Sequence, residues 1–65
     1  MEEHALRALI VEDLKIHPKS KISEIHKRMD ELDLKYLRRV VYRMYDDGIL
    51  SREGVKSNMV YFLTK

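Results

Sequence analysis

The sequence predicts an α+β fold in which three helices precede a C-terminal β-hairpin. Apolar residues recur at helical spacing over residues 2–16 and 34–47. A short helix flanked by capping residues fits between these segments, and two strand-like segments near the C-terminus enclose a polar stretch that contains glycine. Because the chain has 65 residues, we expect a single domain, 1–65, that uses nearly every apolar residue in its core.

The first expected helix covers residues 2–16. Two acids at its start favour helix formation there, because the N-terminal end of the helix dipole attracts negative charge. Pro18 ends the helix, since proline moves the residue before it out of the helical conformation. Residues 19–22 are partly β-branched and are expected to pair as a short third strand. The apolar stripe of the helix consists of Ala5, Leu6, Leu9, Ile10 and Leu14.

The middle of the chain predicts a helix-turn-helix. Ser23 has the character of an N-cap for a short helix over 24–32. Asp33 is the next N-cap, and it opens a longer helix over 34–47. Gly48 follows at the position where a left-handed residue commonly ends a helix. A short helix, a tight corner and a longer helix together form a helix-turn-helix, and the hairpin follows over 49–64.

The helix over 34–47 has two faces of opposite chemistry. Its core face consists of Leu34, Leu37, Val40, Val41, Met44 and Tyr45. Its solvent face consists of Lys35, Tyr36, Arg39, Tyr42 and Arg43, with Arg38 at the edge. Cations interleaved with tyrosines are typical of a surface that contacts an anionic partner. Contact with nucleic acid and a solvated or protein-binding face are both open interpretations of this pattern.

Charge is unevenly distributed along the chain, although the net charge is only +2. Residues 1–16 contain two basic and four acidic side chains, whereas residues 34–65 contain seven basic and three acidic ones. The C-terminal half is therefore cationic and the first helix is acidic. This separation favours an anionic partner for the second half of the chain.

Several classes of function are not expected from the composition. The chain has no Cys, and His4, His17 and His26 lack the spacing of a metal site. We find no Ser/His/Asp arrangement and no glycine-rich phosphate loop, so we expect no catalytic residues, no metal, no cofactor and no enzyme activity. No apolar segment approaches the roughly 20 residues that span a bilayer, so we expect a cytoplasmic protein without membrane contact.

Three passages of the sequence resemble the winged helix-turn-helix family. They are ISEI at 22–25, YDDGIL at 45–50 and YFLT at 61–64. The likeness covers essentially the whole chain, in the order helix, short strand, helix, helix and two-stranded hairpin. The last two passages look like those of many bacterial and archaeal transcriptional regulators. The resemblance therefore implies a prokaryotic or archaeal DNA-binding protein with a role in transcription regulation.

The resemblance also implies which residues contact double-stranded DNA. In this family the third helix lies in the major groove, while the hairpin, or wing, reaches the backbone or an adjacent minor groove. The implied contacts on the helix are Lys35, Tyr36, Arg38, Arg39, Tyr42 and Arg43. Those on the wing are Arg52, Lys56, Ser57 and Asn58, and Lys21 or Ser23 approaches a phosphate at the start of the second helix. Arg39 and Arg43 are the better candidates for contacts to bases.

Two further expectations concern protein partners. Val11 lies outside the apolar stripe of the first helix, and the hairpin carries apolar residues on both faces. These residues indicate a homodimer through the first helix and/or the wing. The alternative is a monomer in which Val11 is an ordinary exposed apolar residue and Val60 and Phe62 of the hairpin fold over the end of the core. The main alternative to DNA binding is a winged helix that binds another protein through its acidic first helix or its hairpin. No small-molecule ligand is expected, because the chain has no separate ligand domain.

Overall fold

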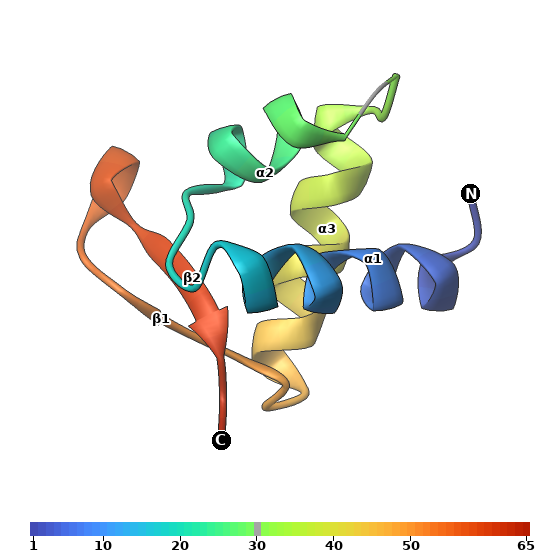
Figure 1. Ribbon diagram of the computed structural model, residues 1–65. Helices are drawn as coiled ribbons and strands as arrows, with labels where there is room; N and C mark the ends of the chain where they lie inside the picture. The colour runs from blue at the N-terminus through green and yellow to red at the C-terminus, as the bar shows by residue number, and fades with distance from the viewer. Residues whose placement is uncertain (30) are drawn as a thin grey trace.

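The computed structural model describes residues 1–29 and 31–65, and within them it contains three α-helices and one two-stranded antiparallel sheet (Figure 1). The elements are α1 (Glu3–Ile16), α2 (Ile22–Arg28), α3 (Leu34–Asp46), β1 (Leu50–Glu53), a 3-10 turn η1 (Lys56–Asn58) and β2 (Val60–Leu63). This α+β order is compatible with a winged helix. None of the helices in the described residues is long and apolar enough to cross a membrane.

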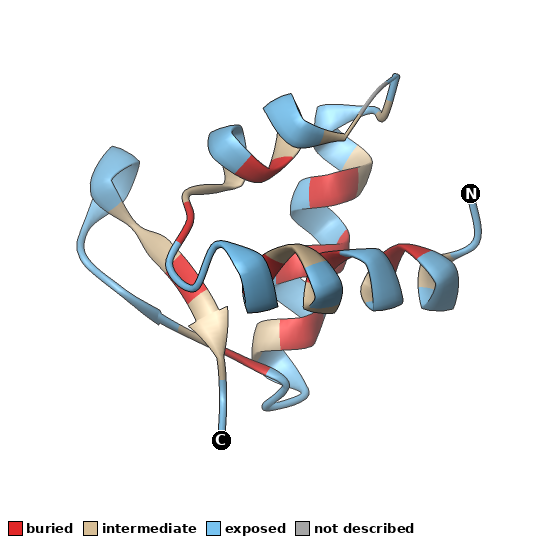
Figure 2. Ribbon diagram, viewed as in Figure 1, coloured by how far each residue is buried: buried red, intermediate tan, exposed pale blue. Residues whose placement is uncertain are grey.

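The core lies where α1 crosses α3, and α2 and the hairpin close its other sides (Figures 1 and 2). Each helix contributes the side chains that its sequence period places on one face. The fully buried apolar residues are Leu6, Ile10 and Leu14 of α1, Ile25 of α2, Leu37, Val40, Val41 and Met44 of α3, and Leu50 and Tyr61 of the hairpin. The predicted core faces of the two long helices are therefore confirmed at their centres.

The apolar stripe of α1 is displaced from its predicted position. Leu9 is 46% exposed and Ala5 is also exposed, whereas Val11 is half-buried against the core. Leu9 borders a shallow hollow beside Met29 and Leu32. Because α2 ends at Arg28, it is too short to cover this side of α1. The expectation that Leu9 belongs to the core and that Val11 lies outside it was wrong.

Helix α2 begins earlier and ends earlier than predicted. Its N-cap is Lys21, and Ser23 lies inside the first turn, so the prediction that Ser23 caps this helix was wrong. The carboxylate of Glu24 accepts a hydrogen bond of 2.7 Å from the backbone N–H of Lys21, which fixes the start of the helix. At Glu31 the backbone is left-handed, with φ of 55°, so the helix cannot extend to residue 32. Residue 30, inside the predicted span, lies outside the described residues.

The segment expected to form a third strand makes a single β-bridge, between Ser20 and Tyr61. The backbone N–H groups of the two residues donate to each other's carbonyl oxygens, at 3.1 and 2.8 Å. Because α2 starts at Ile22 with Lys21 as its N-cap, the predicted strand is shortened at its C-terminal end. Ser20 is buried, and its hydroxyl donates to the His17 carbonyl and accepts a bond of 2.8 Å from Arg28. Polar contacts thus hold this corner in place of the predicted strand.

Both ends of α3 follow the predicted signals. The side chain of Asp33 accepts a hydrogen bond of 2.9 Å from the backbone N–H of Tyr36, which confirms Asp33 as the N-cap. The helix ends at Asp46, one residue before the predicted end, and Gly48 has the left-handed φ of 82° expected after a helix. Its N–H donates to the carbonyl of Tyr45, which satisfies one of the last backbone acceptors of the helix.

Replacing Asp33 by Ala is expected to lower the free energy of unfolding by about 1 kcal/mol, because an N–H at the start of α3 loses its acceptor. Urea denaturation followed by circular dichroism measures the change. Asp46→Ala is the matched control: Asp46 is an exposed acid at the other end of the same helix, where negative charge opposes the dipole. The control is expected to be neutral or slightly stabilising. An equal loss of stability in both variants would contradict the capping role.

Candidate nucleic-acid interface

The outward surface of α3 is lined by long cationic side chains and a tyrosine. Because Leu37, Val40 and Met44 are buried beneath it, the residues between them turn away from the core. This surface consists of Lys35, Arg38, Arg39, Tyr42 and Arg43, all of which are exposed. The predicted solvent face of this helix is therefore present, with the exception of Tyr36.

A hollow next to this surface lies between the start of α2, the outer side of α3 and the hairpin. Its lining consists of Lys21, Ile22, Ser23, Arg38, Tyr42, Arg52, Lys56, Ser57, Met59 and Tyr61. Arg38 and Tyr42 border both this hollow and the outer surface of α3, so the two form one continuous surface. We call it the cationic face, and define it as Lys21, Ser23, Lys35, Arg38, Arg39, Tyr42, Arg52, Lys56 and Ser57.

The charges of the cationic face are not compensated within the described part of the chain. Among the described residues, no acid lines the hollow or the outer surface of α3. No carboxylate of residues 1–29 and 31–65 forms an ion pair with the basic residues of the cationic face. By contrast, Lys15, Lys19 and Arg28 are each paired with a carboxylate. Positive charge is therefore concentrated on one side of the molecule, which attracts anions.

The position of Arg52 shows how the hairpin joins this surface. Leu50 is buried, and Arg52 follows two residues later on the same face of β1. Its guanidinium lies 3.9 Å from the centre of the Tyr45 ring. The neighbouring Tyr61 side chain is the main cause that raises the pKa of Arg52. Two tyrosines therefore hold the guanidinium of Arg52 beside α3.

The wing tip contains a strained residue. Lys56 has φ of 51°, which is uncommon for a residue other than glycine. The residue is exposed and lines the same hollow as Arg38 and Tyr42. Backbone strain of this kind is often concentrated at sites that contact ligands. Glycine or asparagine would fit this backbone conformation better than lysine does. The presence of a lysine therefore favours a role for its charge in binding.

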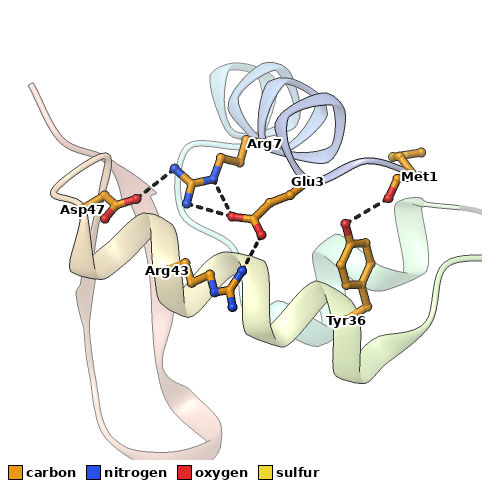
Figure 3. A network of polar contacts seen from close by, with 6 residues as sticks. All are labelled: Met1, Glu3, Arg7, Tyr36, Arg43 and Asp47. Carbon is orange, nitrogen blue, oxygen red and sulfur yellow. Dashed lines mark hydrogen bonds and ion pairs between the residues drawn. The ribbon is translucent and has the colours of Figure 1, made fainter.

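Three residues expected at the interface lie elsewhere or at its edge. Tyr36 is half-buried, and its hydroxyl donates a bond of 2.9 Å to the carbonyl of Met1, on the side of α3 that faces the start of α1 (Figure 3). Arg43 lies at the edge of the outer surface, with its guanidinium bound to Glu3. Asn58 is exposed in η1 but does not line the hollow.

Four residues that shape this surface are not among the contacts predicted from the sequence. Ile22, Met59 and Tyr61 line the hollow, and Tyr45 supports Arg52. Tyr45 was expected in the core, but it is only half-buried. Strand alternation counted from Leu50 would have placed Arg52 on the helix-facing side of the hairpin. Which helical residue meets it depends on the packing of the hairpin, so no local signal identifies Tyr45.

Comparisons of this chain with models of protein families, with curated proteins and with solved structures found no match. What the chain binds is therefore inferred from the positions and charges of its own residues. The cationic face is the strongest such feature, because its members come from three segments that are far apart in the sequence.

Replacing Lys56 by Gly is expected to leave the free energy of unfolding unchanged or to raise it by up to about 1 kcal/mol, because the left-handed strain is relieved. Thermal or urea unfolding measures this change. Ser57→Gly is the matched control at the next position, which does not have a positive φ, and is expected to cost about 0.5–1 kcal/mol. Equal destabilisation by both substitutions would show that Lys56 is not strained.

Proposed function

We propose that this protein is a small winged-helix protein that binds double-stranded DNA and catalyses no reaction. The observation that carries the proposal is the cationic face, in which the start of α2, α3 and the hairpin present basic side chains that form no ion pair with a carboxylate of the described residues. The three passages that resemble winged-helix regulators support a cytoplasmic role in transcription regulation. The three helices followed by a two-stranded hairpin are compatible with a winged-helix fold.

The shape of the surface suits a duplex. With 13 residues, α3 is about 20 Å long, and the major groove of B-form DNA, about 12 Å wide, admits an α-helix. Lys35, Arg39 and Tyr42 follow one another along the outer side of α3 at helical spacing. We place Arg39 nearest the base edges, since it lies midway along this side and a guanidinium can bind guanine bidentately.

The remaining cations suit contacts with the phosphate backbone. Arg38 of α3 and Lys56 of the wing both line the hollow between these elements, and Lys21 and Ser23 line it from the start of α2. A phosphate strand that enters this hollow would meet groups from three elements at once. Tyr42 adds a hydroxyl at the junction of the two surfaces. Contacts of this kind fix the register of a protein on DNA without reading its sequence.

A second candidate function is protein binding through a different part of the surface. Leu9 and Ile16, 46% and 74% exposed, border a hollow with Met29 and Leu32 between α1 and the end of α2. Exposed apolar surface of this kind favours contact with a protein, either a second copy of the chain, as expected for a homodimer, or another protein. A dimer in sedimentation experiments at micromolar concentration would favour this candidate as an addition to DNA binding.

Replacing Arg38 by Ala is expected to weaken binding to a random-sequence duplex about tenfold at low salt, because one charge-assisted contact with phosphate is lost. Fluorescence anisotropy with a labelled duplex measures the affinity. Lys15→Ala is the matched control, since it removes the same charge from an exposed side chain of α1 that does not line the cationic face. We expect this control to bind within about twofold of the unmodified protein.

The salt dependence of the same binding reaction tests its electrostatic origin. If about five phosphates are neutralised, log affinity should fall against log salt with a slope near −4 to −5, and Arg38→Ala should reduce the slope by about 1. The proposal fails if the unmodified protein does not bind duplex at low salt. It also fails if Lys15→Ala weakens binding as much as Arg38→Ala does, because only the net charge would then matter.

A further inference from the structure

The start of α1 is bound to the flank of α3 by a chain of ion pairs (Figure 3). One carboxylate oxygen of Glu3 accepts a hydrogen bond of 2.6 Å from Arg43. The other oxygen accepts bonds of 3.2 and 2.9 Å from Arg7. Arg7 in turn pairs at 2.9 Å with Asp47, just beyond the end of α3. Two arginines, one on each helix, therefore share Glu3.

This arrangement makes Arg43 different from the other basic residues on the outer surface of α3. Its charge is matched by Glu3, whereas Arg38 and Arg39 have no carboxylate partner among the described residues. Hydrogen bonding from Arg43 is the main cause that lowers the pKa of Glu3, so the carboxylate is ionised at neutral pH. The side chain of Arg43 is 55% exposed, which leaves it accessible to a second anion.

Glu3 would remain paired if Arg43 moved away. The two arginines bind different oxygens of the carboxylate, so the bonds from Arg7 do not depend on those from Arg43. Arg7 is also held by Asp47, which fixes its guanidinium between the two helices. The contact between α1 and α3 would therefore survive the loss of the Glu3–Arg43 pair. Breaking an ion pair is costly mainly because it leaves one charged group without a partner. Here Glu3 would keep Arg7 as its partner, so this cost is avoided.

We propose that Glu3 competes with a DNA phosphate for Arg43, and that Arg7 retains Glu3 when Arg43 transfers to the phosphate. This inference rests on the DNA-binding function proposed above. Glu3 then limits affinity from a position on α1 outside the cationic face. Arg7 acts as a positioning residue that keeps α1 against α3 in both states. When DNA binds, Arg43 exchanges its ion pair with Glu3 for an ion pair with phosphate. The basic residues of the cationic face, which have no carboxylate partner among the described residues, each gain a new ion pair instead.

The test uses Glu3→Gln, which removes the charge and keeps the size of the side chain. We expect it to bind a random-sequence duplex about threefold more tightly than the unmodified protein at low salt, which corresponds to the strength of one partly exposed ion pair. Glu12→Gln is the matched control, because Glu12 is an exposed acid of the same helix that pairs with Lys15. It removes the same charge and is expected to leave affinity nearly unchanged.

The same substitutions in an Arg43→Ala background complete the test. The gain from Glu3→Gln should disappear there, because Arg43 is absent and Arg7 remains paired with Asp47. A gain that persists without Arg43, or one no larger than that of Glu12→Gln, would overturn the exchange while leaving DNA binding intact. If neither the unmodified protein nor any variant binds duplex, the proposed function fails and the exchange fails with it. Thermal unfolding of each variant shows whether the fold is retained.

Discussion

The packing of α1 across α3 is the contact on which the rest of the structure depends. Leu6, Ile10 and Leu14 of α1 meet four buried residues of α3, and this contact decides which side of α3 turns outward. Burying apolar side chains is the main favourable term in folding. Once α3 is fixed in this way, its basic residues project together, and α2 and the hairpin add theirs from either side. The cationic face is thus a consequence of the core.

The parts of the fold that local signals determine could be predicted from the sequence. Helical periodicity locates α1 and α3, while Asp33 and Gly48 mark the ends of α3. The parts that depend on tertiary packing could not. Whether residues near Ser20 form a strand depends on where α2 begins, and the pairing with Tyr61 joins residues 41 positions apart. The exposure of Leu9 depends in the same way on how far α2 extends.

The candidate site shows the same division. Periodicity separates the basic side of α3 from its apolar side, which correctly places Lys35, Arg38, Arg39 and Tyr42 on the exposed surface. Periodicity does not show which residues at the sides of α3 are bound by a neighbouring segment of the chain. Tyr36 and Arg43 are both bound by the start of α1, through Met1 and Glu3. These contacts link residues 35 and 40 positions apart, so no local pattern in the sequence reveals them.

The most direct test of the proposed DNA-binding role is an NMR titration of the isotopically labelled protein with an unlabelled duplex at low salt. A binding role for the cationic face predicts the largest chemical-shift changes at residues 21–23, 35–42 and 52–57. Leu9 and Ile16, on the side of α1 next to the end of α2, should change little. The absence of shifts, or shifts concentrated on that side of α1, would contradict the DNA-binding role of the cationic face.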